Sequence, residues 1–489
     1  MRSFGNRCRI SLSGAGSRQE GSRQEGRVDS VEFQGKRVTV VGLARSGVAA
    51  CKVLVERGAT VLATEQSPAE KLRVDLSDLA RLGVRLETGG HSPESILGAD
   101  LLVVSPGVDL RLPLFARARA TGIPMWSEVE LAYRLTTARF LAVTGTNGKS
   151  TTTSLLGAMV QAAGFPGVVA GNIGTALCEV APALTPSHWV VAELSSFQLE
   201  TIVEFRAHVA VLLNLAPDHL DRYDSVEDYY AAKARIFLNQ TADDFAVLNA
   251  DDPLVVHYAQ GIRSRLRLFS RLRTVGDGSF LRGDRLVVRR DGRTEPVCET
   301  SRIRIQGVHN VENSLAAAAA ASAIGVPAGD MASALASFPG LPHRLELVAE
   351  VDGVRYVNDS KGTNVGAVVK SLEGYGGGLI LIAGGKDKGG DFTPLRPLVE
   401  TRVKTMILIG QARAKIRAHL DGACPMEEVA SLEAAVERAA QIAAPGETVL
   451  LSPACASFDM FRDFEERGEV FRRAVRGLRS RRDPVEHRG

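Results

Sequence analysis

The sequence predicts an α/β protein built from three consecutive domains. Strand-like apolar runs alternate with helix-like segments along most of the chain, which is typical of parallel sheets covered by helices. The length of 489 residues suits about three domains. Apolar residues make up 45% of the chain and aromatic residues only 5%, a composition that suits packed α/β layers.

Charge, cysteines and hydropathy argue against several classes of protein. The net charge of +3 is small for this length, so we expect neither nucleic acid nor a membrane surface as a partner. The six cysteines lie far apart and form no C-x-x-C pair. This favours reduced thiols in a cytoplasmic protein over a zinc site or a disulfide framework. No apolar run is long enough to span a membrane.

Residues 1–33 are expected to form a disordered tail, because "GSRQEGSRQEG" repeats a unit with almost no apolar content. A first domain is expected over 34–127. It starts with "RVTVVGLARSGVAACKVLVERGATVLATE", which predicts a strand, a glycine turn, a helix that closes at Gly58, and a strand that ends at Glu65. "ADLLVVSPGV" predicts another strand and a turn at Gly107.

A central domain is expected over 128–340, with strands in "RFLAVTG", "HWVVAEL", "VAVLLNL" and "DFAVLNA". Residues 271–305 are expected to form β-hairpins, and "HNVENSLAAAAAASAIG" predicts a helix that stops at Gly325. The last domain, expected over 341–489, has strands in "GVRYVNDS", "GLILIAGG", "TMILIGQ" and "TVLLSPA".

The first glycine turn, Gly42-x-Ala44-x-x-Gly47, is close to a dinucleotide-binding pattern. Ala44 stands where that pattern has the glycine that lets a pyrophosphate approach closely. A ligand-free turn and a site for another nucleotide diphosphate both remain open. The second is favoured over NAD, because helix N-terminal amides bind any phosphate and Arg45 and Ser46 could add donors.

A second glycine loop follows the strand at 139–144. Its residues are Gly145, Thr146, Asn147, Gly148, Lys149, Ser150 and Thr151. The common phosphate-loop spacing would need a glycine at Val143, so this loop is shorter. It still has the amides, the mobile lysine and the hydroxyl that a nucleotide phosphate with Mg²⁺ requires. The alternative is a glycine-rich turn without a ligand.

Other polar side chains are expected at strand ends, where open α/β sheets bind ligands. Glu193 suits Mg²⁺, and Asp218, His219 and Asp221 follow another buried strand. Lys233, taken alone, is a solvated helix lysine. The last domain adds cations and hydroxyls that could hold an acidic substrate: Arg344, Asp359, Lys361, Thr363, Lys386, Lys388, Ser457 and Phe464.

Taken together, these motifs resemble the Mur ligase family. The matching stretches are "TGTNGKST", "GNIG", "ELSSFQLE", "DHLDRY", "AAKARI", "HNVEN", "GLPHR", "NDSKGTN" and "LSPACASFD", which extend over about 35–480. "ELSSFQLE" and "LSPACASFD" are most similar to members that add D-glutamate to UDP-N-acetylmuramoyl-L-alanine in peptidoglycan synthesis. The resemblance implies a Rossmann-like UDP-sugar domain, a central P-loop-type ATPase domain and a Rossmann-like amino-acid domain.

The resemblance also implies an ATP-dependent amide ligase that forms an acyl phosphate and uses two Mg²⁺ ions. Lys149, His219 and Lys233 would be catalytic, Ser150 and Glu193 would serve the first Mg²⁺, and His219 and a carbamylated Lys233 the second. The ATP contacts would include Asn310, Arg344 and Asp359. The UDP-sugar contacts would be Arg45, Ser46, Glu65, Gly107 and Asn172. The D-glutamate contacts would be Lys361, Thr363, Lys388, Ser457, Phe458 and Phe464.

The chain departs from the family pattern at Glu65, Gln66 and Ser67, where an Asp-Thr-Arg sequence can occur. Three alternatives remain: a ligase for another amino acid, a folate-polyglutamylating enzyme, and a non-catalytic nucleotide-binding protein. The separate first domain argues against the folate enzyme. We expect a cytoplasmic monomer whose last domain closes over the substrates.

Overall fold

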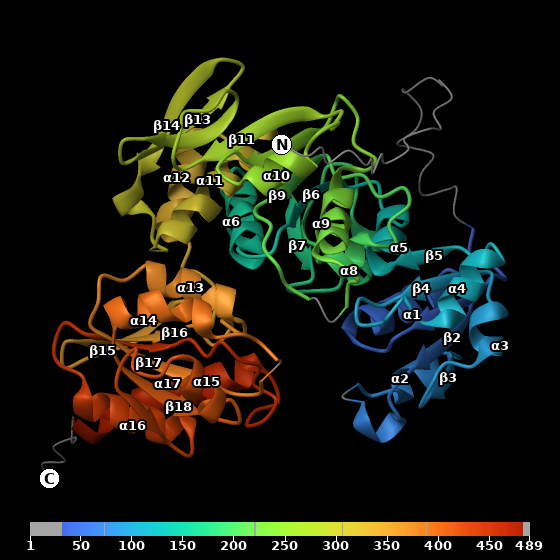
Figure 1. Ribbon diagram of the computed structural model, residues 1–489. Helices are drawn as coiled ribbons and strands as arrows, with labels where there is room; N and C mark the ends of the chain where they lie inside the picture. The colour runs from blue at the N-terminus through green and yellow to red at the C-terminus, as the bar shows by residue number, and fades with distance from the viewer. Residues whose placement is uncertain (1–31, 73, 220–221, 306, 388, 483–489) are drawn as a thin grey trace, which may run out of the picture. The chain divides into compact units, whose positions relative to one another are not determined.

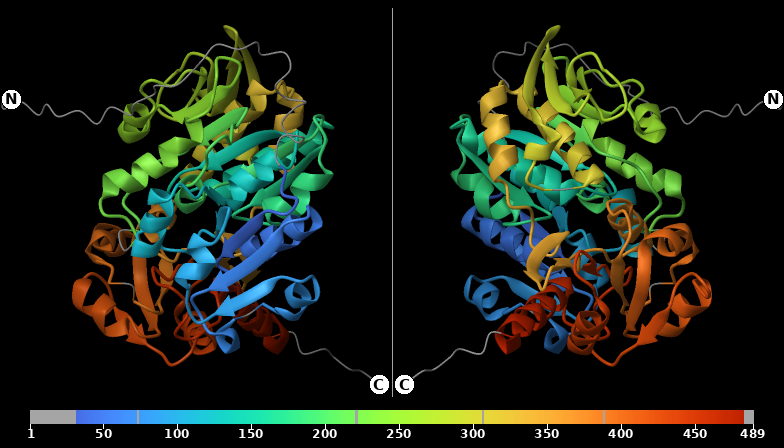
Figure 2. Two further views of the ribbon diagram at one scale, coloured as in Figure 1. Left: turned by 90° about the vertical axis from the view of Figure 1, so that its right-hand side faces the viewer. Right: turned by 90° about the vertical axis from the view of Figure 1, so that its left-hand side faces the viewer.

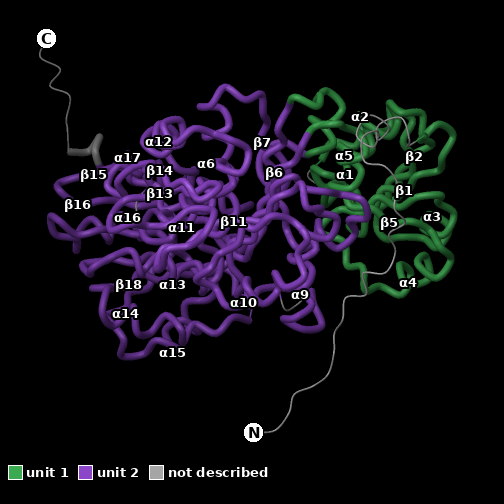
Figure 3. Tube along the Cα trace, turned by 90° about the horizontal axis from the view of Figure 1, so that it is seen from above, with its two compact units in different colours: residues 1–138, 177–187 green, residues 139–176, 188–489 purple. Residues whose placement is uncertain are grey.

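The computed structural model describes residues 32–72, 74–219, 222–305, 307–387 and 389–482 (Figure 1). The expected disordered tail therefore lies almost entirely outside the described residues, as do Asp221 and Lys388. The chain divides into two compact units, residues 1–138 with 177–187 and residues 139–176 with 188–489 (Figure 3). In the described ranges, we find no helix whose length and apolar character would let it cross a bilayer.

The first unit contains a parallel sheet of five strands in the order β3-β2-β1-β4-β5. The strands are β1 (Arg37–Val41), β2 (Thr60–Glu65), β3 (Arg85–Thr88), β4 (Leu101–Val104) and β5 (Met125–Ser127). The helical segments between them are α1 (Arg45–Glu56), η3 (Ala69–Lys71), α2 (Ser77–Arg81), α3 (Pro93–Leu97) and α4 (Pro113–Ala120), and α5 (Glu128–Arg134) follows β5. The later segments α7 (Leu177–Val180) and η4 (Ala181–Ala183) also belong to this unit.

The first glycine turn joins β1 to α1 and is closely packed. A Cβ atom on Gly47 would lie 1.9 Å from the carbonyl oxygen of Gly42, so no larger residue fits there. Gly42 itself has φ +91° and approaches Ser105, whose hydroxyl donates to the Gly42 carbonyl over 2.8 Å. The two glycines are therefore explained by packing, and Ala44 lies exposed between them.

The second unit begins with a sheet of nine strands in the order β14-β13-β12-β11-β10-β9-β6-β8-β7. The strands are β6 (Arg139–Thr144), β7 (Gly167–Gly171), β8 (Trp189–Glu193), β9 (Val209–Leu212), β10 (Phe245–Asn249), β11 (Arg265–Ser270), β12 (Gly278–Arg282), β13 (Arg285–Arg290) and β14 (Arg293–Glu299). Strands β12, β13 and β14 are antiparallel neighbours, so the hairpins expected over 271–305 are present. The other neighbours are parallel.

The helices and 3₁₀ turns around this sheet are α6 (Lys149–Ala162), α8 (Ser196–Leu199), α9 (Val226–Ala234), η5 (Arg235–Phe237), α10 (Pro253–Tyr258), η6 (Thr300–Arg302), α11 (Val308–Ala323) and α12 (Ala328–Ser337). Helix α11 contains the predicted alanine-rich run and stops just before Gly325, which has φ +84°. Residues 316–321 are six consecutive, fully buried alanines. Their small side chains let α11 pack closely against α6 and the sheet.

A second sheet of this unit has six strands in the order β15-β16-β20-β17-β18-β19. They are β15 (Glu346–Val351), β16 (Val354–Asn358), β17 (Leu379–Gly384), β18 (Val403–Ile409), β19 (Met426–Glu428) and β20 (Thr448–Leu451). Only the pair β15 and β16 is antiparallel. The helices are α13 (Val365–Glu373), η7 (Thr393–Leu395), α14 (Arg396–Arg402), α15 (Arg413–His419), α16 (Leu432–Ile442) and α17 (Phe464–Arg482).

Helices cover both faces of this six-stranded sheet (Figure 2). Successive residues of a strand point to opposite faces, so β17 places Leu381 against α13, α14 and α15, and Ile380 and Ile382 against α16 and α17. Burial on both faces explains the continuous apolar run of β17. The predicted fold class, three consecutive α/β domains, is confirmed by the three sheets.

Candidate active site

The loop between β6 and α6 has the geometry of a phosphate cradle. Gly145 has φ +149°, and Gly148, directly before α6, has φ +83°. A Cβ atom on Gly148 would lie only 2.3 Å from Oδ1 of Asn313, while one on Gly145 would lie 2.9 Å from Cβ of Leu213. Both positions therefore require glycine, and the loop delivers the first amides of a 14-residue helix to the carboxyl edge of the sheet.

Two lysines converge on this loop. The Lys149 ammonium donates to the carbonyl oxygens of Gly145 and Thr146, each over 2.8 Å. The Lys233 ammonium donates to the same Gly145 carbonyl over 2.8 Å and lies 4.6 Å from the ring centroid of Tyr229. Sequence alone described Lys233 as solvated, but its side chain is 2% exposed. The structure therefore corrects that interpretation, since α9 brings the side chain under the loop.

Burial is the main cause that lowers the pKa of both lysines. The pKa of Lys233 lies well below its usual value, and the neighbouring Lys149 ammonium lowers it further. The pKa of Lys149 is also lowered by burial, while the Glu193 carboxylate opposes that shift. The neutral form of Lys233 is therefore favoured beside the charged Lys149, and a phosphate dianion placed here would be attracted to the Lys149 ammonium.

Glu193 and Ser150 lie beside the same loop. Glu193 ends β8 and is 1% exposed; its Oε1 accepts the amide of Asn172 over 2.7 Å. Its Oε2 is buried and has no hydrogen-bond partner among the described residues. The Ser150 hydroxyl accepts from Nη2 of Arg344 over 2.7 Å. A carboxylate oxygen without a partner and a hydroxyl at a phosphate loop are suitable ligands for a hard cation.

Several residues that hold the loop were not singled out by sequence. Asn214 accepts the Asn147 amide over 2.8 Å and donates to its carbonyl over 3.1 Å. Oδ1 of Asn313 accepts a hydrogen bond from the Thr152 hydroxyl over 3.2 Å, and Nδ2 of Asn313 donates to Oδ1 of Asn310 over 3.2 Å. Asn313 lies three residues after Asn310 on a helix, a spacing that places both on one face and could have identified it.

His219 is more exposed than the lysines and the glutamate beside the phosphate loop. Its side chain is 47% exposed, its φ is +55°, and its Nε2 lies 3.8 Å from Oδ2 of Asp218. Its ring makes edge contacts with Phe197 at 5.0 Å and Tyr229 at 6.0 Å between centroids. Among the described residues, no group of three or more His, Cys, Asp or Glu side chains lies close enough together to hold a metal.

The remaining predicted ATP residues are buried or partly buried. Thr151 and Asn310 are each 8% exposed. Oδ2 of Asp359 accepts the hydroxyls of Ser371 and Ser452, each over 2.7 Å. Burial raises the pKa of Asp359 to about 6, and the two hydroxyl donors partly oppose this.

The expected amino-acid contacts follow β16 and β20. Nζ of Lys361 lies 3.6 Å from the ring centroid of Phe464, and burial lowers the pKa of Lys361 to about 8. The Thr363 amide donates to the Lys361 carbonyl over 2.8 Å. Ser457 is buried, whereas Phe458 is 63% exposed. Lys388 lies outside the described residues.

The expected UDP-sugar residues of the first unit lie around its glycine turn. Arg45 is exposed and Ser46 half-buried at the start of α1, and Gly107 is exposed. Both carboxylate oxygens of Glu65 accept backbone amides, Oε2 from Leu43 over 2.8 Å and Oε1 from Ser67 over 3.0 Å. Glu65 therefore holds the turn together in the structure.

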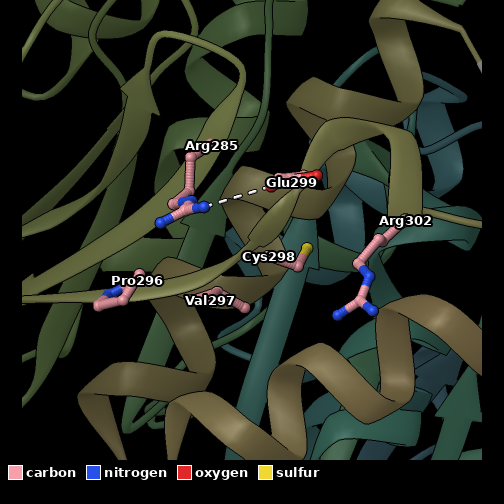
Figure 4. Close-up of a pocket in the computed structure, with 6 residues that line it drawn as sticks. All are labelled: Arg285, Pro296, Val297, Cys298, Glu299 and Arg302. Carbon is pink, nitrogen blue, oxygen red and sulfur yellow. Dashed lines mark hydrogen bonds and ion pairs between the residues drawn. The ribbon is translucent and has the colours of Figure 1, made fainter.

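A separate pocket of about 440 Å³ lies along β14, an edge strand (Figure 4). Its lining residues are Arg285, Pro296, Val297, Cys298, Glu299 and Arg302. Arg285 and Glu299 form an ion pair of 3.2 Å across it. None of the residues singled out from the sequence lines this pocket.

The chemistry that the phosphate loop supports is transfer of a phosphoryl group, because it combines helix amides, two lysines, an arginine and a buried carboxylate. Family comparisons agree with this class. The descriptions that match are Mur ligase MurD-like, N-terminal domain (residues 36–127), Mur ligase middle domain (143–321) and Mur ligase, glutamate ligase domain (343–455). The chain belongs to the Mur ligase family. Membership of this family implies use of ATP.

The most similar curated relatives include UDP-N-acetylmuramoylalanine--D-glutamate ligases. The protein from Geotalea uraniireducens is 48% identical over 92% of this chain and 99% of its own length. Those from Acidobacterium capsulatum and Pelotomaculum thermopropionicum are 46% identical over 91% and 45% identical over 92% of this chain, covering 97% and 99% of their own lengths.

Solved structures with the same fold include a pseudomurein peptide ligase type C from Methanothermus fervidus and the UDP-N-acetylmuramate-alanine ligase from Thermotoga maritima. Each has a TM-score of 0.57 and covers 91% of this chain and 100% of its own. Their identities of 17% and 19% limit this likeness to the fold.

Proposed function

We propose that this chain joins D-glutamate to UDP-N-acetylmuramoyl-L-alanine in peptidoglycan synthesis, with ATP converted to ADP and phosphate. Support comes from relatives that are 45–48% identical over nearly the whole chain and are named for this reaction. The main structural support for phosphoryl transfer is the pair of lysines that donate to the Gly145 carbonyl, beside the buried Oε2 of Glu193.

The reaction that fits these groups has two steps. The substrate carboxylate attacks the γ-phosphorus of ATP, which gives an acyl phosphate and ADP. The D-glutamate amine then attacks the acyl carbon, and the tetrahedral intermediate expels phosphate. A carboxylate is a poor electrophile, so phosphorylation supplies the leaving group that amide formation needs.

Lys149 and Arg344 would offset the negative charge that builds up when the substrate carboxylate approaches the triphosphate of ATP. Lys149 donates to the carbonyls of the loop, and its ammonium would turn to the β- and γ-phosphates when ATP binds. Arg344 donates to Ser150, so its guanidinium is held at the start of α6. Asn310 and Asp359 would complete the ATP contacts.

The residues beside the loop fit Mg²⁺ at one position, and a second position would need a modified Lys233. Ser150 and Glu193 would hold the first, since Mg²⁺ accepts one carboxylate, a hydroxyl and phosphate oxygens while it keeps several waters. His219 and Lys233 would hold the second. Bound Mg²⁺ would neutralise phosphate charge and orient the γ-phosphate for in-line attack.

Lys233 fits the second position only after modification, because an ammonium repels a cation. The neutral amine can add CO₂ with loss of one proton, which converts the side chain to a carbamate anion. Burial and the nearby Lys149 ammonium lower the Lys233 pKa, and this favours the neutral amine that CO₂ requires.

The amino-acid substrate would lie over the loops after β16, β17 and β20. Lys361 and Lys388 would bind its carboxylates, with Thr363, Ser457, Phe458 and Phe464 around it. Arg45, Ser46, Gly107 and Asn172 would contact the UDP-sugar, and Glu65 would act through the turn that it holds. We also propose that the protein is a monomer in the cytoplasm.

Phosphate release from ATP tests the function directly. The purified chain is assayed with Mg²⁺, UDP-N-acetylmuramoyl-L-alanine and either D- or L-glutamate. We expect release with D-glutamate only, and Lys149→Ala should lower its rate by about a hundredfold or more. Lys52→Ala, which changes an exposed lysine of α1, is the matched control. Equal rates with both glutamates, or with neither, would contradict the proposal.

A further inference from the structure

Arg467 is a fully buried arginine that none of the proposed catalytic or binding roles uses. It lies in the first turn of α17, and its side chain is 0% exposed. Burial is the main cause that lowers its pKa to about 10, so the guanidinium stays charged at neutral pH. A buried charge is costly, which raises the question of what this one does.

The guanidinium joins two loops that follow neighbouring strands. Toward the loop after β16 (residues 359–364), Nε donates to the Ser360 hydroxyl over 2.9 Å and Nη2 to the Ser360 carbonyl over 2.8 Å. Toward the loop after β20 (residues 452–463), Nη1 donates to the carbonyls of Cys455 and Ala456 over 3.2 and 3.4 Å. Its planar fork thus sets the spacing between the β16 loop and the β20 loop.

Each end of this bridge is next to a proposed substrate contact. Ser360 directly precedes Lys361, and its hydroxyl donates to the Phe464 carbonyl over 2.8 Å. Ala456 directly precedes Ser457, and its carbonyl also accepts the Lys386 amide of the loop after β17 over 2.9 Å. A small change in the position of Arg467 would therefore move the groups on three loops together.

The hydrogen-bond acceptors around the Arg467 guanidinium are all uncharged groups. All four of its side-chain hydrogen bonds go to carbonyl or hydroxyl oxygens, and no described carboxylate forms an ion pair with it. The titratable groups that favour its charged form electrostatically are Cys455, Asp459 and Asp359, in that order. In an interior of low dielectric constant, such a charge produces a positive potential at the adjacent sheet edge.

We infer that Arg467 is a positioning residue for the amino-acid substrate, which holds the β16 and β20 loops at one spacing and favours a dicarboxylic amino acid by its charge. This inference rests on the proposed function. Arg467 would act in two ways: its planar fork sets the spacing of the β16 and β20 loops, and its positive charge attracts the carboxylates of the amino-acid substrate.

The test compares Arg467→Lys, which keeps the charge but loses the fork, with Arg467→Met, which loses both. Arg467→Lys should raise KM for D-glutamate by about tenfold and leave KM for ATP within about twofold. Arg467→Met should raise KM for D-glutamate further. Guanidinium at low concentration should restore part of the activity of Arg467→Ala, and methylammonium should restore less.

Two controls separate positioning from loss of stability. Phe471→Leu weakens the same helix at a fully buried apolar position, and Arg473→Ala changes an exposed arginine of that helix. Both should keep the wild-type KM for D-glutamate. If Arg467 variants do not fold, Ser360→Ala removes one acceptor of the bridge and should raise the same KM selectively.

Three results would overturn the inference. The first is a wild-type KM for D-glutamate in Arg467→Lys or, where that variant does not fold, in Ser360→Ala. The second is a parallel rise of the KM values for ATP and D-glutamate. The third is a rise in Phe471→Leu equal to that in the Arg467 variant. A wild-type chain with no D-glutamate-dependent phosphate release overturns the proposed function as well, which distinguishes the two failures.

Discussion

Gly148 offers a quantitative test of the phosphate-loop geometry, because the chain contains a matched control at the other end of the same helix. Gly148 precedes α6 with φ +83°, and Gly164 follows it with φ +72°. An added Cβ at Gly148 would lie 2.3 Å from Oδ1 of Asn313, whereas one at Gly164 would meet nothing within 4 Å. Replacement by alanine therefore has the same backbone cost at both positions and a steric cost only at Gly148.

The two costs can be estimated separately. A left-handed conformation costs a residue with a Cβ atom about 1–2 kcal/mol, which is the full effect expected for Gly164→Ala. Overpacking adds about 1–3 kcal/mol, so Gly148→Ala should lose about 2–5 kcal/mol. Gly148→Ala should also raise KM for ATP, because the displaced residue carries the first amides of α6 and precedes Lys149.

The assay is the midpoint of denaturant unfolding together with KM for ATP, for each single variant and for Gly148→Ala combined with Asn313→Ala. Removal of Oδ1 should recover part of the lost stability, which gives a coupling of about 0.5–3 kcal/mol in the double-mutant cycle. Equal losses of unfolding free energy in Gly148→Ala and Gly164→Ala, or no coupling to Asn313, would show that the contact with Oδ1 of Asn313 has no steric cost.

Three further changes test a lysine and an arginine of the site and the buried Glu128 of α5 in the first unit, whose carboxylate accepts the Cys178 amide over 2.6 Å. Lys233→Met should abolish ligation yet raise the thermal midpoint at neutral pH, because a buried amine of lowered pKa opposes folding. Its advantage over wild type should shrink as pH rises toward about 10.5, where the unfolded lysine also loses its proton; a constant advantage would contradict this. Burial raises the pKa of Glu128 from 4.5 to about 7, so the folded chain binds more protons in that window and wild-type stability should fall by about 3 kcal/mol as pH rises through it. In Glu128→Gln, the thermal midpoint should fall less over this pH range than in the wild type. An equal fall would contradict the raised pKa of Glu128. Arg344→Lys should raise KM for ATP by about tenfold and spare KM for D-glutamate, since it removes the guanidinium group that donates to Ser150; the opposite pattern in steady-state kinetics would exclude the ATP role.

The fold class and the glycine turn between β6 and α6 were predictable because both depend on local patterns. Alternating apolar runs and helical segments predict parallel sheets, and Gly145, Gly148 and Lys149 predict a turn into a helix. The environment of Lys233 could not be predicted in this way. Its burial depends on α9 crossing under a loop whose Gly145 carbonyl lies 88 residues earlier in the sequence, and a helix lysine shows no local sign of such a contact.

Long-range hydrogen bonds also limited what the sequence could show for Glu65 and Arg467. Glu65 ends a strand, as a ribose-binding residue would, but the structure shows both of its oxygens on backbone amides of its own turn region. Arg467 lies in an arginine-rich terminal helix, where most arginines are expected to face solvent. Only the packing of α17 against two strand-end loops distinguishes it from Arg473.

In the proposed reaction the ATP γ-phosphate activates the substrate carboxylate, and an ¹⁸O label follows that transfer. UDP-N-acetylmuramoyl-L-alanine carrying ¹⁸O in its carboxylate is turned over with ATP, Mg²⁺ and D-glutamate, and the products are analysed by mass spectrometry. An acyl phosphate places one labelled oxygen in inorganic phosphate and leaves the other in the new amide, and this is the result expected. Unlabelled phosphate with label retained elsewhere, or label found in AMP, would contradict the account.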